Sequence, residues 1–227
     1  EVFRQYLGRA GEGLKALHIK FETGYRPEHW RKNCVAVGLA GGFVEPLEST
    51  GIALIELATY LLTHLLPGDT DNMESAARHY NEMMVARYDR IIDFIKMHYC
   101  LSQRRDSAFW LDNCDVASIP QTLQDKLGKW KERPPHRLDF VSDLEMFMTS
   151  SWQYVLYGME FKTDLEPMRS AYPDVEAARR EFAMIRQAGA HALSDLPDHR
   201  ALVEQMCHDY AQRSRSDVKV TASASSL

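Results

Sequence analysis

The part of the chain that follows Gly51 is patterned almost entirely for α-helices. Residues 52–66 are an apolar run that ends at Pro67-Gly68-Asp69, a combination typical of a turn at the end of a helix. Residues 72–98 form a long amphipathic stretch, in which apolar side chains recur at helical spacing. These side chains are Met84, Tyr88, Ile91, Ile92, Ile95 and Tyr99. The pattern predicts a protein that is mostly α-helical.

The second half of the chain carries further helical patterns. They lie at residues 107–113, 120–132, 141–159, 175–193 and 198–213. The stretch 141–159 is rich in aromatic and Met side chains, and the last two patterns are separated by Leu196-Pro197. The Ser/Ala-rich segment 214–227 is predicted to be disordered.

Two short strands are predicted ahead of the helices. Residues 16–23 alternate polar with apolar side chains, and residues 34–37 are an apolar run too short for a helix. Cys34 in this second strand is expected to be an inert core thiol. Because two strands do not make a stable sheet alone, we expect the chain to be the back part of a larger α+β protein. Its predicted parts are residues 1–51, the helical region 52–213 and the tail 214–227.

Composition and charge exclude several classes of protein. The 227 residues are 45% hydrophobic and 26% charged, as in ordinary soluble globular proteins. The net charge of -5 argues against a general nucleic-acid binder. The four cysteines lack Cys-x-x-Cys spacing, which indicates neither a zinc site nor a disulfide framework. No apolar run spans a bilayer comfortably, and the first residues lack a signal-peptide core. A cytoplasmic protein that binds no membrane is expected.

The most informative segment for function is the turn that opens the helix at residue 52. Ser49-Thr50-Gly51 stands at the helix start, where unpaired backbone N–H groups and the positive end of the helix dipole favour a small anion. Glu45 and Glu48 flank this turn. The sequence therefore predicts an anion site next to carboxylates.

The sequence around this turn resembles the signature of the flavin-dependent tryptophan halogenase family. The matching run is NCVAVGLAGGFVEPLESTGI at residues 33–52. Two further stretches agree in order and rough spacing: DFIKMHYCLSQRRDSAFWLDN at residues 93–113 and SSWQYVLYGM at residues 150–159. The resemblance implies the carboxy-terminal part of a flavin-monooxygenase-like fold, in which about two strands precede a helical region that covers the substrate.

The resemblance also implies an activity. Family members bind FAD on an amino-terminal part and receive reduced flavin from a partner reductase. A flavin hydroperoxide then oxidises chloride or bromide, and the hypohalous acid passes to a lysine beside an aromatic substrate. This sequence contains neither the Gly-x-Gly-x-x-Gly turn nor the Trp-x-Trp-x-Ile-Pro motif, and it does not identify the lysine. We therefore expect FAD to be bound mainly by upstream sequence and the 227-residue chain alone to be inactive.

By resemblance, the turn supplies the catalytic and halide-binding groups. Glu48 matches the glutamate beside the reacting carbon, and the backbone N–H groups of Thr50 and Gly51 match the halide site. The expected flavin contacts are Leu39, Ser49 and Ile52. The physical reasoning agrees, because a halide beside a flavin needs neutral donors rather than a cation that would trap it. An isolated glutamate at a helix start would more often be a cap, but the complete motif favours catalysis.

Candidate substrate contacts come from aromatic side chains. Phe109 and Trp110 offer stacking faces to an indole or phenol ring. In tryptophan-specific members a later helix carries a Phe-Trp pair and an Asn, and the aligned residues here are Met146, Phe147 and Ser151. Ser142 falls near the place of the glutamate that binds free tryptophan, which favours other indoles, phenols or carrier-bound groups. An aromatic residue on a helix is more often part of the core, and this alternative stays open.

Other chemistries receive little support from the sequence. His79 with Glu82, or His64 with His98, lacks the spacing of a metal site, and no Gly-x-Ser-x-Gly elbow indicates a hydrolase. No metal is expected. The expected partners are a transient flavin reductase, a small aromatic substrate and a second copy of the chain in a homodimer. The alternative to an enzyme is a helical binding or scaffold module that keeps the halogenase fold without catalysis.

Overall fold

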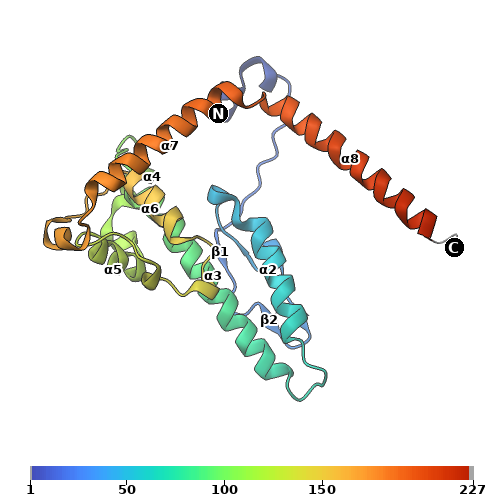
Figure 1. The fold of residues 1–227 in the computed structure, drawn as a ribbon. Helices are drawn as coiled ribbons and strands as arrows, with labels where there is room; N and C mark the ends of the chain where they lie inside the picture. The colour runs from blue at the N-terminus through green and yellow to red at the C-terminus, as the bar shows by residue number, and fades with distance from the viewer. Residues whose placement is uncertain (1, 225–227) are drawn as a thin grey trace. The chain divides into compact units, whose positions relative to one another are not determined.

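The computed structural model describes the backbone of residues 2–224 and the side chains of residues 3–141 and 143–211. The chain divides into two compact units, Glu1–Pro167 and Met168–Leu227 (Figure 1). The first unit contains every strand of the described residues together with two hydrophobic cores.

The strands of the first unit are each two residues long and form two antiparallel pairs. They are β1 (Gly24–Tyr25), β2 (Trp30–Arg31), β3 (Cys34–Val35) and β4 (Gly42–Phe43). In the pair β1–β4, Gly24 lies opposite Phe43, and in the pair β2–β3, Trp30 lies opposite Val35. These small ladders hold the segment that leads into the helices.

The rest of the first unit is helical. Its α-helices are α1 (Val2–Leu7), α2 (Thr50–Leu65), α3 (Met73–Cys100), α4 (Ala108–Cys114), α5 (Gln121–Trp130) and α6 (Thr149–Gly158). Short 3-10 helices are η1 (Gly8–Gly11), η2 (Gly38–Ala40), η3 (Leu47–Ser49), η4 (Val116–Ser118), η5 (Arg137–Asp139) and η6 (Ser142–Leu144), and η7 (Glu166–Ala171) crosses the boundary at Pro167 into the second unit. The helices predicted at residues 52–66, 72–98, 107–113 and 120–132 are confirmed as α2 to α5, and the α+β class is confirmed as well.

The strand predicted at residues 16–23 is wrong. These residues have no regular secondary structure, and Leu17 and Ile19 are exposed by 82% and 66%. An alternating pattern becomes a strand only where a neighbouring strand pairs with its backbone, and the described residues provide none there. The strand predicted at residues 34–37 is confirmed only at Cys34–Val35. Cys34 is exposed, so the expectation of a core thiol is also wrong, because β3 is covered on the Val35 side alone.

The single helix predicted at residues 141–159 is interrupted. Between η6 and α6 the backbone is extended at Met148, with φ -68° and ψ 158°. Two arginines of α3 hold this interruption, because Arg87 Nη2 donates to the Asp143 carbonyl at 2.7 Å and Arg90 Nε donates to Glu145 Oε1 at 2.9 Å. The Arg87 bond gives the Asp143 carbonyl a partner in place of the backbone N–H that a continuous helix would have supplied, and the Arg90 bond ties the Glu145 side chain to α3.

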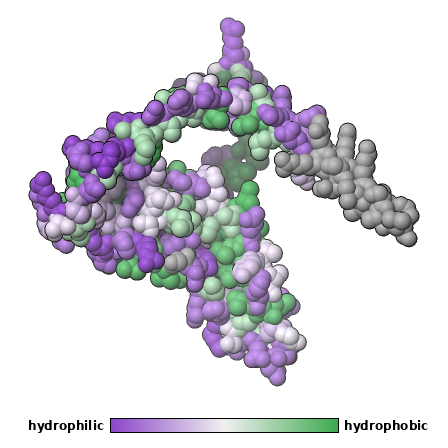
Figure 2. All heavy atoms as spheres, viewed as in Figure 1, coloured by the Kyte–Doolittle hydropathy of each residue, from purple (hydrophilic) through white to green (hydrophobic). Residues whose placement is uncertain are grey.

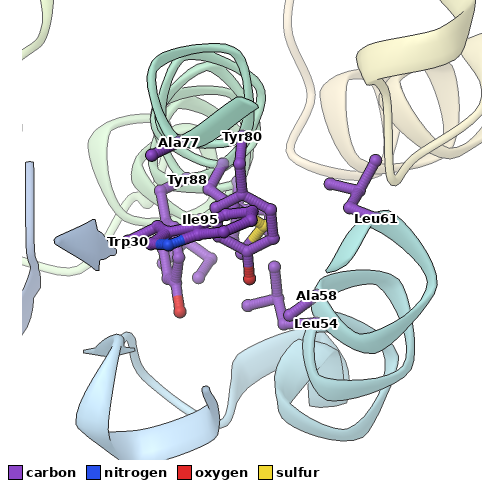
Figure 3. Close-up of a cluster of buried hydrophobic side chains, with 10 residues drawn as sticks. Trp30, Leu54, Ala58, Leu61, Ala77, Tyr80, Tyr88 and Ile95 are labelled. Atoms are coloured by element: carbon purple, nitrogen blue, oxygen red, sulfur yellow. The ribbon is translucent and has the colours of Figure 1, made fainter. Parts of the chain in front are cut away.

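The first hydrophobic core lies between α2, α3 and β2 (Figure 3). Leu54, Ala58 and Leu61 project from one face of α2 towards Trp30 and Tyr80. The rings of Trp30 and Tyr80 meet edge to face, with centroids 5.7 Å apart. This packing orients α2, and therefore its first turn, relative to α3.

The second core joins the carboxy-terminal half of α3 to α5 and α6. Its buried residues are Phe94, Met97, Leu123, Trp130, Trp152 and Leu156. A buried ion pair borders it, in which Lys126 Nζ of α5 donates to Asp93 Oδ2 of α3 at 2.7 Å. Phe147 packs against both cores.

The second unit consists mainly of α7 (Val175–Asp195) and α8 (His199–Ala224). Asp174 caps α7 by accepting a hydrogen bond from the Ala177 N–H at 2.7 Å. α7 buries none of its residues, and both hydrophilic and hydrophobic residues lie on its surface (Figure 2). α8 continues to Ala224, so it runs through most of the segment predicted to be disordered, of which residues 225–227 lie outside the described residues. Within the described chain, no helix combines the length and apolarity needed to cross a membrane.

Candidate active site

The turn from Glu45 to Gly51 connects β4 to α2 and has an unusual backbone. Glu48 and Ser49 are consecutive left-handed residues, with φ values of 66° and 54°. A non-glycine residue in this region costs on the order of 1–3 kcal/mol, and such strain gathers at ligand sites and switches. Contacts elsewhere in the unit must therefore hold the turn in place.

The first turn of α2 has no side-chain cap and borders open space at Gly51. Ser49 is the N-cap residue, yet no side-chain hydrogen bond caps the helix. Thr50 is 4% exposed, and its buried Oγ1 has no hydrogen-bond partner among the described residues. Gly51 is exposed, and a Cβ atom built on it would meet nothing within 4 Å. The start of α2 is thus an uncapped, partly open helix terminus, which suits a small anion.

The two glutamates of the turn are bound by consecutive residues of α3. Glu48 Oε1 lies 3.0 Å from His98 Nε2, and the hydroxyl of Tyr99 donates a short hydrogen bond to Glu45. Burial and this bond raise the pKa of Tyr99 to about 12. Glu48 therefore faces α3 and does not cap α2.

An apolar pocket of about 370 Å³ opens on the α2 side of the turn. Its lining includes the three residues predicted to contact flavin: Leu39, Ser49 and Ile52. Leu39 and Ile52 are exposed by 79% and 74%, which is unusual for side chains of this size. Gly38 has φ +61°, and a Cβ atom there would come within 3.3 Å of Ile55. The glycine therefore lets the backbone of η2 lie close to α2.

A smaller pocket of about 200 Å³ lies on the α3 side of the turn. Val44 and Glu45 line both pockets. Lys96 also lines the smaller one, where its Nζ donates to Asn113 Oδ1 at 2.8 Å and Ser118 Oγ at 3.0 Å. Burial lowers the pKa of this lysine. The apolar stripe of the sequence already contained Ile92, Ile95 and Tyr99, but their position at this pocket could not be predicted, because the other lining residues lie far away along the chain.

The predicted substrate residues fall into two groups. Phe109 and Trp110 of α4 surround the ring of Tyr99, with centroid distances of 5.4 and 5.9 Å. They therefore lie next to the residue that binds Glu45. The group around α6 consists of Met146, Phe147 and Ser151, which are all half-buried. Phe147 stacks on Phe94 with centroids 3.9 Å apart, and Phe94 meets the His98 ring edge to face at 5.0 Å.

The histidines weighed as metal ligands have other surroundings. His98 binds Glu48, and His64 Nδ1 lies 2.8 Å from the Tyr60 carbonyl one helical turn earlier. Among the described residues, no group of three or more His, Cys, Asp or Glu side chains is placed to hold a metal ion.

Comparisons with known proteins agree on one family. The tryptophan halogenase family model matches residues 2–174. The 7-chloro-L-tryptophan 6-halogenase KtzR of Kutzneria sp. (strain 744) is 32% identical over 205 residues, which cover 90% of this chain and 39% of that protein. The chain thus spans about two fifths of the length of such relatives.

Solved structures of relatives share the fold as well. The tryptophan halogenase of Shewanella frigidimarina is 34% identical with a TM-score of 0.76, and the match covers 88% of this chain and 39% of that one. BrvH, a flavin-dependent halogenase from Brevundimonas sp. BAL3, is also 34% identical, with a TM-score of 0.71 and coverage of 82% and 37%. Both the sequence and the fold place this protein in one group: the chain belongs to the tryptophan halogenase family.

Proposed function

We propose that this chain is the carboxy-terminal part of a flavin-dependent halogenase that acts on an electron-rich aromatic substrate. The observation that carries the proposal is the turn from Glu45 to Gly51. It combines an uncapped helix start, a carboxylate held by α3 and one wall of an apolar pocket within a few residues. Relatives that the chain matches over 39% of their length are tryptophan halogenases, which supports the same assignment.

The apolar pocket fits the ring system of a flavin. Leu39 and Ile52 expose large apolar surfaces beside it, and a flat aromatic ring would cover them. Reduced FAD, delivered by a flavin reductase, would supply the electrons that turn dioxygen into the oxidant of the halide. The chain contains no Gly-x-Gly-x-x-Gly turn, so the phosphate and adenine parts of FAD would be held mainly by sequence outside these 227 residues.

The start of α2 is proposed to hold chloride or bromide. The backbone N–H groups of Thr50 and Gly51 offer neutral donors at the positive end of a 16-residue helix. Neutral donors bind a halide weakly enough for it to leave when it reacts. Ser49 lines the apolar pocket directly before these donors, which supports a halide site next to the flavin site.

Glu48 is proposed to act at the reacting ring. Electrophilic halogenation adds the halogen to an aromatic carbon, builds positive charge on the ring and then removes a proton from that carbon. A carboxylate beside the ring stabilises this charge and helps to orient the oxidant. Glu48 is 37% exposed at its side chain, so the carboxylate remains within reach of a ligand.

The substrate is proposed to be an indole, a tryptophan-like compound or a phenol. Phe109 and Trp110 lie beside Tyr99 and offer ring faces near the turn, whereas Phe147 is already stacked on Phe94. The proposed substrate contacts are Phe109 and Trp110, and the resemblance to the family adds Met146, Phe147 and Ser151. A homodimer and a cytoplasmic location stay predictions from the sequence.

The proposal is tested by assaying the full-length protein with reduced FAD, oxygen and either halide against tryptophan, other indoles and phenols. We expect one aromatic class to gain a halogen, as read by mass spectrometry. Glu48→Gln should lower turnover by 100-fold or more, in the range of other lost catalytic groups (~10²–10⁴), with FAD binding nearly unchanged. Halogenation of no substrate in the panel by flavin-loaded wild-type protein would contradict the proposal.

The flavin pocket is tested separately. Because Leu39 and Ile52 are exposed, Leu39→Ser and Ile52→Ser should change the free energy of unfolding by less than about 0.5 kcal/mol. Both variants should weaken FAD binding, measured by the quenching of flavin fluorescence. Glu56 is exposed on α2, the helix that carries Ile52. Glu56→Ser is therefore the matched control and should bind FAD as wild type does.

A further inference from the structure

We infer that His98 is a positioning residue for Glu48, and that an extra proton joins the two side chains. A neutral imidazole beside an ionised carboxylate would hold one proton, whereas this pair holds two. The inference rests on the proposed function, because it names what holds the proposed catalytic carboxylate. It comes from the hydrogen bonds at both nitrogens of the His98 ring.

One ring nitrogen has its role fixed by the backbone. His98 Nδ1 lies 2.8 Å from the carbonyl oxygen of Phe94, one helical turn earlier on α3. A carbonyl oxygen can only accept a hydrogen bond, so Nδ1 must carry a proton. The edge-to-face contact with the Phe94 ring, at 5.0 Å and 86°, holds the imidazole in this orientation.

The other nitrogen faces the carboxylate. His98 Nε2 lies 3.0 Å from Glu48 Oε1. A neutral imidazole that is protonated on Nδ1 has a lone pair on Nε2, and an ionised carboxylate also offers lone pairs alone. Such a contact would bring two acceptors together. The observed distance therefore requires an additional proton, which lies on Nε2, so that an imidazolium donates to the Glu48 carboxylate.

The surroundings explain why Glu48 needs such a partner. Its backbone is left-handed, as is that of Ser49, and the turn itself provides no side-chain cap. His98 binds Glu48 and the next residue, Tyr99, binds Glu45, so the last turn of α3 holds both the beginning and the middle of the turn. The His98 side chain is only 18% exposed, and a charge-assisted bond in such a place is strong.

The second carboxylate oxygen of Glu48, Oε2, is the one that His98 does not bind. Among the described residues, Oε1 is the Glu48 atom that is engaged by His98, which leaves Oε2 for a ligand. His98 therefore fixes the direction of Oε2 and supplies positive charge behind it. It acts through Glu48 and is not itself expected to touch the substrate.

The first test uses two substitutions of His98, each of which keeps a different one of the two ring N–H donors. The amide nitrogen of a Gln side chain reaches about as far as His Nε2, and that of Asn about as far as His Nδ1. His98→Gln keeps the donor to Glu48, and His98→Asn keeps only the donor to Phe94. In the full-length, flavin-loaded enzyme we expect His98→Asn to lower kcat by about 10- to 100-fold, with KM for the aromatic substrate changed less than threefold. His98→Gln should recover most of the lost kcat. Equal kcat values for both variants would overturn the inference.

A second test does not depend on turnover. In protein with ¹⁵N-labelled histidine, NMR reports whether each nitrogen of the His98 ring carries a proton. At the pH of the activity assay, both nitrogens should carry a proton in the wild type, whereas only Nδ1 should carry one in Glu48→Gln, whose side-chain amide donates to Nε2. Identical ring signals in the two proteins would overturn the inference. A protein that halogenates no substrate would end the proposed function, while this comparison would still decide the proton sharing.

Discussion

The side-chain amide of Asn81 on α3 binds both backbone groups of Trp30, the N–H and the carbonyl. Its Oδ1 accepts a hydrogen bond from the Trp30 N–H at 2.7 Å, and its Nδ2 donates to the Trp30 carbonyl at 2.9 Å. The amide thus takes the place of a neighbouring strand on the edge of β2 that faces α3. Trp30 itself is 3% exposed, so this bidentate contact fixes the core residue that joins the small strands to the helices.

Asn81→Ala is expected to lower the free energy of unfolding by about 2–4 kcal/mol, because it leaves a backbone donor and a backbone acceptor without partners near a buried side chain. Urea unfolding at fixed pH measures the change. Glu82→Ala alters the next residue, which is exposed, and should stay within about 0.5 kcal/mol of wild type. If both variants unfold alike, the bidentate contact does not stabilise the fold.

The helices could be predicted from the sequence because their signal is local. The apolar stripe of α3 repeats over 28 residues, and most of its members are buried as predicted. The strand expected at residues 16–23 depended on partners that a local pattern cannot show, and this segment is irregular in the structure. The interruption before α6 was missed for the same reason, since the arginines that bind it, Arg87 and Arg90, lie more than 50 positions away along the chain.

The candidate site could be predicted only in part. Glu48, Thr50 and Gly51 stand together in one short motif, so sequence alone was enough to single them out. His98 and Tyr99 hold the same turn from α3, and their separations from Glu48 and Glu45 are 50 and 54 residues. No periodicity or motif connects residues so far apart; only the packing of α2 on α3 brings them together.

Asp139 makes the stability of the first unit depend on pH. Its carboxylate accepts hydrogen bonds from Arg133, from Trp130 Nε1 at 3.1 Å and from the His136 N–H at 2.9 Å. These bonds, above all those from the Arg133 guanidinium, hold the pKa of the Asp139 carboxyl well below its usual value. The unfolded chain therefore takes up this proton first. The stabilisation is complete above about pH 4 and is lost as pH falls further.

Asp139→Asn should lower the free energy of unfolding by about 2–3 kcal/mol at pH 7, because the arginine loses its ionised partner. The difference from wild type should shrink at pH 3, where the wild-type contribution is itself being lost. Chemical denaturation at both pH values measures it. Asp125→Asn is the control, since Asp125 is exposed on α5 and should matter little at either pH. A difference that grows towards pH 3 would refute the assigned cause.

Phe147 and Phe109 should separate the core role of an aromatic residue from a role in substrate binding. Phe147 packs against both cores and stacks on Phe94, so Phe147→Ala should cost about 2–4 kcal/mol without any ligand present. Phe109 is 49% exposed, and Phe109→Ala should cost less than half as much but raise KM for the aromatic substrate. Urea unfolding and steady-state kinetics on both variants provide the comparison. The reverse order of stability losses would exclude the core assignment of Phe147.

Ser49 should report the strain stored in the turn. Its φ of 54° is a conformation that glycine adopts without penalty, and its side chain caps nothing. Ser49→Gly is therefore expected to raise the free energy of unfolding by up to about 1 kcal/mol, and Ser49→Val to lower it, because a β-branched residue is strongly disfavoured at positive φ. Differential scanning calorimetry of the two variants gives the sign directly. Ser49→Gly should also affect activity. Glycine allows the turn to leave its fixed conformation, so this variant should gain stability while its rate of halogenation falls. If both variants have a lower free energy of unfolding than wild type, the Ser49 side chain makes a contact whose stabilisation exceeds the cost of its backbone strain.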